Sequence, residues 1–178
     1  NLYLSTGTKD ITAASLVLEP LANFDAKGDL VAKLAAEIPT LENGGVAQDG
    51  KSITWKLKDG VKWSDGTPLT AHDVLFSFEL LRDKGLSSYR TIISKIVAKA
   101  ELIDDHTIKF IFRPDYPRRD VIQSVGGQIV FSREDFRKNK RDIEQSSDKP
   151  FIGSGPYMAD AAEMGRWVSV RRNPDYWG

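Results

Sequence analysis

Apolar and polar residues alternate along two stretches of the chain, and this period of two predicts strands with one buried face. Residues 53–57 read Ile-Thr-Trp-Lys-Leu, and residues 108–112 read Ile-Lys-Phe-Ile-Phe. Asp59-Gly60 follows the first stretch and is typical of a hairpin turn, so we expect that strand to pair with residues 61–63. Asp104-Asp105 precedes the second stretch, which we expect to pair with the residues before that turn.

A helical period follows the first strand. Apolar residues spaced three and four apart between residues 74 and 81 fall on one face of a predicted helix. Thr70 and Asp73 form a Thr-x-x-Asp capping box in front of it, and Gly85 is expected to end it.

The other patterns are weaker. Residues 30–37 read Leu-Val-Ala-Lys-Leu-Ala-Ala-Glu, which are good helix formers and predict a helix before a proline. Residues 118–125 and 133–140 also indicate helices. The chain ends with a predicted strand, a turn near Gly165 and a strand at Trp167–Arg171. The sum is a mixed α+β chain rich in antiparallel hairpins.

Composition narrows the function classes. The 178 residues carry a net charge of zero, which argues against a nucleic-acid surface, and no cysteine, which excludes disulfides and cysteine zinc sites. Basic residues are dense only in the run 133–141, where Glu134 and Asp135 are interspersed. We interpret this run as a solvated helix face.

Candidate catalytic groups are few. His72 and His106 lack the spacing of metal ligands, so we expect them to be turn or surface residues. Two pairs of acids, Asp59 with Asp65 and Asp104 with Asp105, occur beside Gly or Thr residues, where aspartate bonds to nearby backbone. A hydrolase would need two carboxylates facing each other across a cleft. We therefore expect no enzyme, no cofactor and no metal.

Aromatic side chains remain as candidates for binding. Trp55 and Trp167 lie on strand patterns, where we expect core or sheet packing, whereas Tyr89 lies in a predicted Ser-Ser-Tyr loop, where a binding role is more plausible. The further candidates for lining a ligand cleft are Trp63, Tyr116, Tyr157, Tyr176 and Trp177.

Five segments occur in a familiar order: LVLEPL, DGKSITWKLKDGVKWSDGTPLTAHDVLFSFELL, DDHTIKFIF, GSGPYM and VRRNPDYWG. This order resembles the family 5 extracellular solute-binding proteins of ABC importers, of the oligopeptide- and dipeptide-binding type. The resemblance runs from about Gly7 to Gly178. The Asp-Gly-Thr-Pro-Leu-Thr-Ala-x-Asp-Val stretch and the Arg-Asn-Pro-x-Tyr-Trp ending, Arg172 to Trp177, are its most specific parts.

The resemblance implies a fold. Such proteins are bilobal clamps of the type II-like periplasmic-binding class, and this sequence corresponds to a hairpin-rich part of the first lobe, with the second lobe absent. About residues 20–150 resemble the smaller subdomain of that lobe. Residues 1–19 and 151–178 resemble parts of its main subdomain.

The resemblance also implies a receptor that captures peptides in the cleft between lobes and delivers them to the membrane permease of an ABC importer. Its place is periplasmic or extracellular, with a lipid anchor in Gram-positive bacteria. The ligand is held largely by main-chain hydrogen bonds, and hinge closure encloses it. We expect this 178-residue piece to bind peptide more weakly than the full-length protein, and to self-associate through surface that the missing parts would cover.

Site residues follow from the resemblance position by position. Gly7 and Thr8 match a loop before the first helix whose backbone touches the ligand, and Tyr89 matches a tyrosine beside it. Glu19 matches a common glutamate to which we also assign a structural role, holding the loop at Thr8. Gly127, with Gly126 before it, lies in a stretch that lines the cleft in some members.

Three alternative functions stay open. A receptor of the same fold could take nickel, a sugar or an opine, although no histidine or cysteine cluster supports metal. A stand-alone carbohydrate-binding module would show a flat platform of exposed aromatic residues, and a hydrolase would show paired carboxylates across a cleft.

Overall fold

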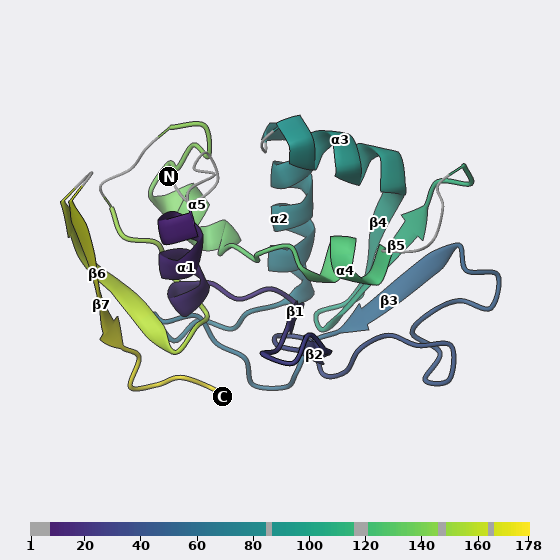
Figure 1. Ribbon diagram of the computed structural model, residues 1–178, viewed down its shortest axis with the longest axis horizontal. Coiled ribbons are helices and arrows are strands. Elements are labelled where there is room, and N and C mark those ends of the chain that lie inside the picture. The colour runs from purple at the N-terminus through teal and green to yellow at the C-terminus, as the bar shows by residue number, and fades with distance from the viewer. Residues whose placement is uncertain (1–7, 85–86, 116–120, 146–148, 164–165) are drawn as a thin grey trace.

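A computed structural model describes residues 8–84, 87–115, 121–145, 149–163 and 166–178. Figure 1 shows a three-stranded sheet and a two-stranded hairpin at opposite ends of the molecule, with helices between them. The helices are α1 (Thr8–Val17), α2 (Ala71–Lys84), α3 (Ser87–Ile96), α4 (Val121–Gly126) and α5 (Arg133–Lys138). The strands are β1 (Ala22–Phe24), β2 (Leu30–Ala32), β3 (Ser52–Lys56), β4 (Val97–Asp104), β5 (Thr107–Phe112), β6 (Tyr157–Glu163) and β7 (Trp167–Arg172).

The three-stranded sheet is antiparallel in the order β3-β5-β4. The alternation in the sequence correctly predicted which side chains face inward, because Trp55 lies opposite Ile108 in the register and both are fully buried. Phe110, on the same face, meets Phe78 of α2 edge-on with ring centres 5.3 Å apart. Helix α2 thus covers the buried face of this sheet (Figure 1).

The partner of β3 differs from the prediction, because β3 pairs with β5 and not with residues 61–63. The chain does turn at Gly60, but it then folds back on itself through a second turn at Gly66, and both glycines have a φ near +80° that favours glycine. The amide of Trp63 donates to the carbonyl of Thr67 (2.8 Å), and Leu69 donates to Val61 (3.0 Å). Residues 61–63 therefore bond to residues 67–69, and β3 pairs instead with β5, which is distant in the sequence.

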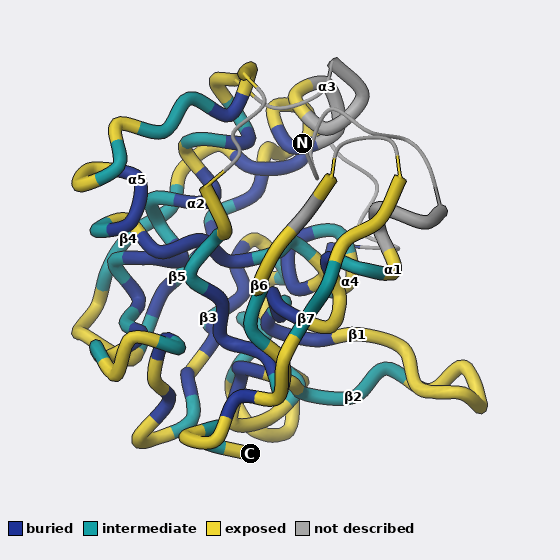
Figure 2. The backbone as a smooth tube through the Cα atoms, turned by 90° about the vertical axis from the view of Figure 1, so that its left-hand side faces the viewer, coloured by how far each residue is buried: buried dark blue, intermediate teal, exposed yellow. Residues whose placement is uncertain are grey.

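The helix predicted for residues 30–37 is wrong, since Leu30–Ala32 forms β2 and pairs with β1. The turn between them is fixed by the carboxylate of Asp25, which accepts hydrogen bonds from the amides of Lys27 (2.8 Å) and Asp29 (2.9 Å). The backbone N–H and C=O groups that would bond along a helix instead pair with β1. Figure 2 shows the turn of this hairpin as an exposed projection.

The remaining elements agree with the sequence in outline. The weak helix patterns at 118–125 and 133–140 correspond to α4 and α5, and the final two strands to β6 and β7. Gly85 and Gly165, expected at a helix end and a turn, lie outside the described residues. Among the helices in the described ranges, none is long and apolar enough to cross a membrane.

Candidate functional site

Glu19 lies just after α1 in a buried polar cluster. Its side chain is 7% exposed, and its Oε1 accepts a hydrogen bond from the Tyr176 hydroxyl at 3.0 Å. Its backbone N–H donates to Ser154 Oγ (3.2 Å), while its carbonyl accepts from the amide of Val130 (3.2 Å). In the described part of the chain, Oε2 of Glu19 is buried without a hydrogen-bond partner.

Burial governs the electrostatics of this cluster. It raises the pKa of Glu19, although the Tyr176 hydrogen bond and the charges of Lys33 and Lys58 act in the opposite direction. The pKa of Tyr176 rises to about 12, because burial and the neighbouring Glu19 carboxylate both disfavour the phenolate. The proton of the Tyr176 hydroxyl therefore stays on the tyrosine, and burial disfavours the charged form of the Glu19 carboxyl group.

The tail after β7, residues 173–178, closes over this cluster. Asn173 Nδ2 donates to the carbonyl of Gly155 (3.3 Å), and Trp177 Nε1 donates to the carbonyl of Ser154 (3.0 Å). The Lys58 ammonium lies 5.1 Å from the centre of the Trp177 ring. Through these contacts, the Arg-Asn-Pro-x-Tyr-Trp ending holds residues 153–155 against the end of α1.

The Gly-Ser-Gly stretch allows a close backbone approach. A Cβ atom on Gly153 would overlap the carbonyl oxygen of Val17, so any side chain there would collide with the end of α1. The N–H of Gly155 donates to that same carbonyl at 2.9 Å. This contact caps the last turn of α1 with backbone from the far end of the chain.

The other site residues from the sequence are only partly described. Gly127 is exposed in the turn after α4, and the nearby bridge between Pro20 and Ile129 brings that turn beside the strand that follows Glu19. Gly7 lies outside the described residues, as do the side chains of Thr8 and Tyr89.

The positions of two of these residues differ from the loops that the sequence suggested. Tyr89 belongs to α3, not to a loop, and Thr8 is the first residue of α1. Helix α1 separates Thr8 from Val17 by about 14 Å. The hydrogen bonds of Glu19 accordingly lie at the opposite end of that helix from Thr8.

The aromatic residues form no flat platform among the described residues. Trp55 and Trp63 are buried in the core. Trp167 lies on β7, as its strand pattern predicted, but it is 51% exposed, so of the expected core or sheet packing the core part is wrong; its indole N–H donates to Glu163 (3.1 Å). Tyr157, which is also exposed, lies at the opposite end of the β6–β7 ladder. The geometry gives no support to the carbohydrate-binding alternative.

The acid pairs serve turns, as predicted. Asp65 Oδ1 accepts from the amide of Thr67 (3.0 Å), and Asp104 Oδ1 accepts from the amide of His106 (2.8 Å), which lowers the pKa of Asp104. His72 Nε2 lies 3.5 Å from Asp105 on the surface. Within the described ranges, no group of three or more His, Cys, Asp or Glu side chains is arranged to hold a metal ion.

Comparisons with known proteins agree with this architecture. The family model of the bacterial extracellular solute-binding proteins, family 5 Middle, matches residues 29–178. The "Probable peptide-binding protein YejA" of Agrobacterium fabrum is 32% identical over 186 residues, which cover all of this chain and 28% of YejA. The "Peptidoglycan-binding protein YepA" of the same organism is 32% identical over 71% of this chain and 20% of its own length.

Solved structures show the same fold. AgaA from A. tumefaciens R10, in complex with agropinic acid, superposes with a TM-score of 0.80 at 26% identity, covering 99% of this chain and 34% of AgaA. DppA from Helicobacter pylori, in complex with the peptide STSA, gives a TM-score of 0.80 at 22% identity, covering 99% of this chain and 37% of DppA. The chain thus spans about a third of these structures and has the fold of part of one lobe of a periplasmic binding protein. It belongs to the family 5 bacterial extracellular solute-binding proteins.

Proposed function

We propose that this chain is part of the first lobe of a peptide receptor that serves an ABC importer in the periplasm or at the cell surface, anchored by lipid in a Gram-positive host. The observation that carries this proposal is the match to YejA, whose name states peptide binding, over the whole of this chain and 28% of YejA. The receptor would capture peptides and pass them to the membrane permease. It would carry out no chemical step of its own.

The proposed ligand-facing residues are Gly7, Thr8, Glu19, Tyr89 and Gly127. The buried cluster supports the choice of Glu19 alone among these five, since a buried carboxylate oxygen without a partner among the described residues can still accept a hydrogen bond. We divide the lobe into residues 20–150 and the paired segments 1–19 and 151–178. Ser154 and Tyr176 join the two paired segments at Glu19, and the hydrogen bond from the Val130 amide to the Glu19 carbonyl links them to residues 20–150.

The test is ligand binding by the full-length protein. It would be purified from cells for native mass spectrometry, and then titrated by calorimetry with an equimolar pool of Ala-X-Ala tripeptides. We expect co-purified peptide and saturable binding of the pool. We also expect much weaker binding by the 178-residue piece, because a single lobe encloses only one side of a ligand. A full-length protein that retains no peptide and ignores the pool would contradict the proposal.

An opine is the second candidate ligand. The likeness to AgaA, a protein solved with agropinic acid, covers 99% of this chain at 26% identity and favours this possibility. Agropinic acid added to the calorimetric titration separates the two classes. Binding of agropinic acid without binding of the tripeptide pool would assign the receptor to opines.

A further inference from the structure

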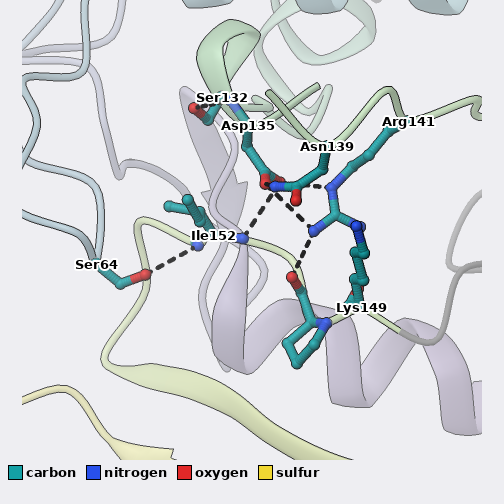
Figure 3. Close-up of polar contacts among 9 residues, drawn as sticks. Ser64, Ser132, Asp135, Asn139, Arg141, Lys149 and Ile152 are labelled. Atoms are coloured by element: carbon teal, nitrogen blue, oxygen red, sulfur yellow. Dashed lines mark hydrogen bonds and ion pairs between the residues drawn. The ribbon is translucent and has the colours of Figure 1, made fainter. Parts of the chain in front are cut away.

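A buried ion pair follows α5, in a part of the sequence that looks like a solvated surface. Asp135 and Arg141 have side chains only 2% and 3% exposed, and Arg141 Nε donates to Asp135 Oδ2 at 2.8 Å. Asn139 Nδ2 donates to the other oxygen of the same carboxylate at 2.6 Å. Figure 3 shows both side chains converging on Asp135. The expectation that the whole run 133–141 is a solvated face is therefore wrong for Arg141.

The end of α5 explains how Arg141 returns to Asp135. Lys140 has a φ of 47°, in the left-handed region, and its N–H donates to the carbonyl of Arg137 (3.4 Å). The N–H of Arg141 donates to the carbonyl of Phe136 at 3.0 Å. These two bonds are those of a Schellman motif, which reverses the chain at a helix end. The reversal places the guanidinium of Arg141 beside the first turn of the helix that it follows.

Arg141 also holds a segment that has no regular structure. Residues 149–153 belong to no helix or strand. Within them, Arg141 donates to the carbonyls of Lys149 (2.9 Å) and Pro150 (2.5 Å), and its guanidinium lies 4.4 Å from the centre of the Phe151 ring. One planar side chain thus binds three consecutive residues in a fixed arrangement, which a lysine could not reproduce.

The same segment runs on to the end of α1. Gly153 exchanges two hydrogen bonds with Ser64: its N–H donates to Ser64 Oγ at 3.3 Å, and its carbonyl accepts from the Ser64 N–H at 2.8 Å. The next residues, Ser154 and Gly155, hold Glu19 and Val17 as described above. We call residues 149–155 the crossing segment. It leads without interruption from the guanidinium of Arg141 to the backbone of Glu19.

A buried ion pair is a poor source of net stability, because removing two charges from water costs about as much as their attraction returns. What such a pair can supply is a single defined geometry. The crossing segment is where that geometry is needed, since no strand partner sets its path and Gly153 must approach Val17 within backbone contact.

We propose that Asp135 and Arg141 are a positioning pair: they fix the path of the crossing segment and, through it, the position of Glu19 at the end of α1. The consequence for ligand affinity rests on the proposed function, because it assumes that the Glu19 cluster faces the ligand. The consequence for the backbone does not depend on any ligand.

The test is hydrogen exchange of backbone amides, followed by mass spectrometry, on the full-length protein. In Arg141→Met we expect the amides of Glu19 and Gly155 to exchange at least about tenfold faster, the effect of weakening roughly one hydrogen bond. In the double variant Asp135→Leu/Arg141→Met, which leaves no buried charge, these two amides should still exchange faster, while amides of β3 and β5 should keep their rates. Arg137→Met is the matched control, because Arg137 lies in α5, the helix that contains Asp135, and pairs with Glu134 on the surface. It should leave every amide unchanged.

Three results would overturn the proposal. One is faster exchange throughout β3 and β5 in the double variant, which would show that the altered exchange is only general destabilisation. Another is faster exchange confined to residues 149–152, which would show that the pair does not reach α1. If Arg141→Met does not fold, the double variant Asp135→Leu/Arg141→Met removes the unpaired carboxylate and should fold. Wild-type exchange of Glu19 and Gly155 in that variant would be the third.

The ligand readout separates this proposal from the proposed function. With the Ala-X-Ala pool, Arg141→Met should bind at least about tenfold more weakly than the wild type, Arg141→Lys should fall between them, and Arg137→Met should match the wild type. If the wild type binds no peptide, the proposed function fails, while the exchange pattern still decides whether the pair positions α1. Unchanged affinity in Arg141→Met, with exchange altered, would overturn the assigned link to the ligand.

Discussion

Asp73 and Asp135 are both buried carboxylates in the first turn of a helix, yet they are satisfied in different ways. Asp73 Oδ2 accepts from the backbone N–H of Thr70 (3.0 Å) and from Trp63 Nε1 (3.4 Å), and its Oδ1 accepts from the N–H of Arg133 (2.9 Å). All three donors are neutral. Asp135 instead has a buried guanidinium as its main partner. One carboxylate is held by amides and an indole, the other by a full positive charge.

The difference teaches where a local sequence pattern suffices. The bond from Thr70 to Asp73 spans three residues, so a capping box could be predicted from spacing, and the positive end of α2 favours the charge. Arg141 lies six residues from Asp135, a separation that no helical pairing rule covers. Only the chain reversal at Lys140 brings the two together.

The largest expected effect comes from breaking the buried pair. Arg141→Met should lower the free energy of unfolding by about 3–5 kcal/mol, because it leaves a buried carboxylate without its cation. The double variant Asp135→Leu/Arg141→Met should recover most of that loss, since no buried charge remains. Urea denaturation of the full-length variants measures both. A double variant as unstable as the single one would show that the charge itself is not the cause.

The corner around Asp73 should be the next most sensitive. Asp73→Ala leaves the amides of Thr70 and Arg133 without an acceptor and should cost about 2–3 kcal/mol. Asp73→Asn keeps one acceptor oxygen and should cost about half as much. Urea denaturation gives the energies, and a shift in tryptophan emission would report the loss of the Trp63 bond. Equal losses in the two variants would mean that the acceptor oxygen kept by asparagine contributes nothing.

Much of the fold could be predicted because its signals are local. The inward-facing residues of β3 and β5, the start of α2 and the β6–β7 hairpin all follow from periods and turn residues within about ten positions. The errors arose where distant partners decide. Residues 30–37 have the composition of a helix, but Leu30–Ala32 pairs with β1, and the partner of β3 is β5, which begins at Thr107.

The candidate site was less predictable than the fold. Glu19 and Tyr176 both lie in segments that carried the resemblance, but nothing local shows that residues 157 positions apart share a hydrogen bond. Nothing in the sequence around Ser154 indicates that its hydroxyl accepts a hydrogen bond from the Glu19 amide. Buried polar contacts of this kind depend on the completed fold, so a sequence can name the participants without pairing them.

Glu19 extends the comparison to a third buried acid, one that has no cation bonded to it and one oxygen without a partner among the described residues. Its pKa is raised above 4.5, so the folded state disfavours the charged form. The stability of the wild type should therefore fall, relative to Glu19→Gln, as pH rises through 4.5 towards the folded pKa, and then level off. Thermal unfolding of both proteins between pH 4 and pH 8 measures this difference.

The sign of that pH dependence is the informative part. Below the unfolded pKa of Glu19 both states are protonated, so the two proteins should differ by an amount independent of pH. Tyr176→Phe should enlarge the loss at high pH, because the carboxylate then loses its one hydroxyl donor. A wild type that gains stability over Glu19→Gln as pH rises would show that Glu19 is better paired when charged than the structure indicates.

The smallest effect on stability is expected for Arg137→Met, although Arg137 lowers the pKa of the exposed acid Glu134 by a large amount. Arg137 and, more weakly, Lys138 hold the pKa of Glu134 at about 2, below its ordinary 4.5. A lowered pKa contributes stability that is present above 4.5 and is lost as pH falls towards 2. Because solvent and salt screen an exposed pair, Arg137→Met should change the melting temperature at pH 7 by no more than about 2 °C.

The same variant should nevertheless move the NMR titration midpoint of the Glu134 carboxyl group back towards 4.5. A melting temperature lowered as far as in Arg141→Met would contradict the contrast between the two pairs, because exposure would then not separate them. A small thermal change with a large titration shift would support it. The two arginines lie four residues apart and each binds an acid of the same helix, so burial is the variable that this comparison isolates.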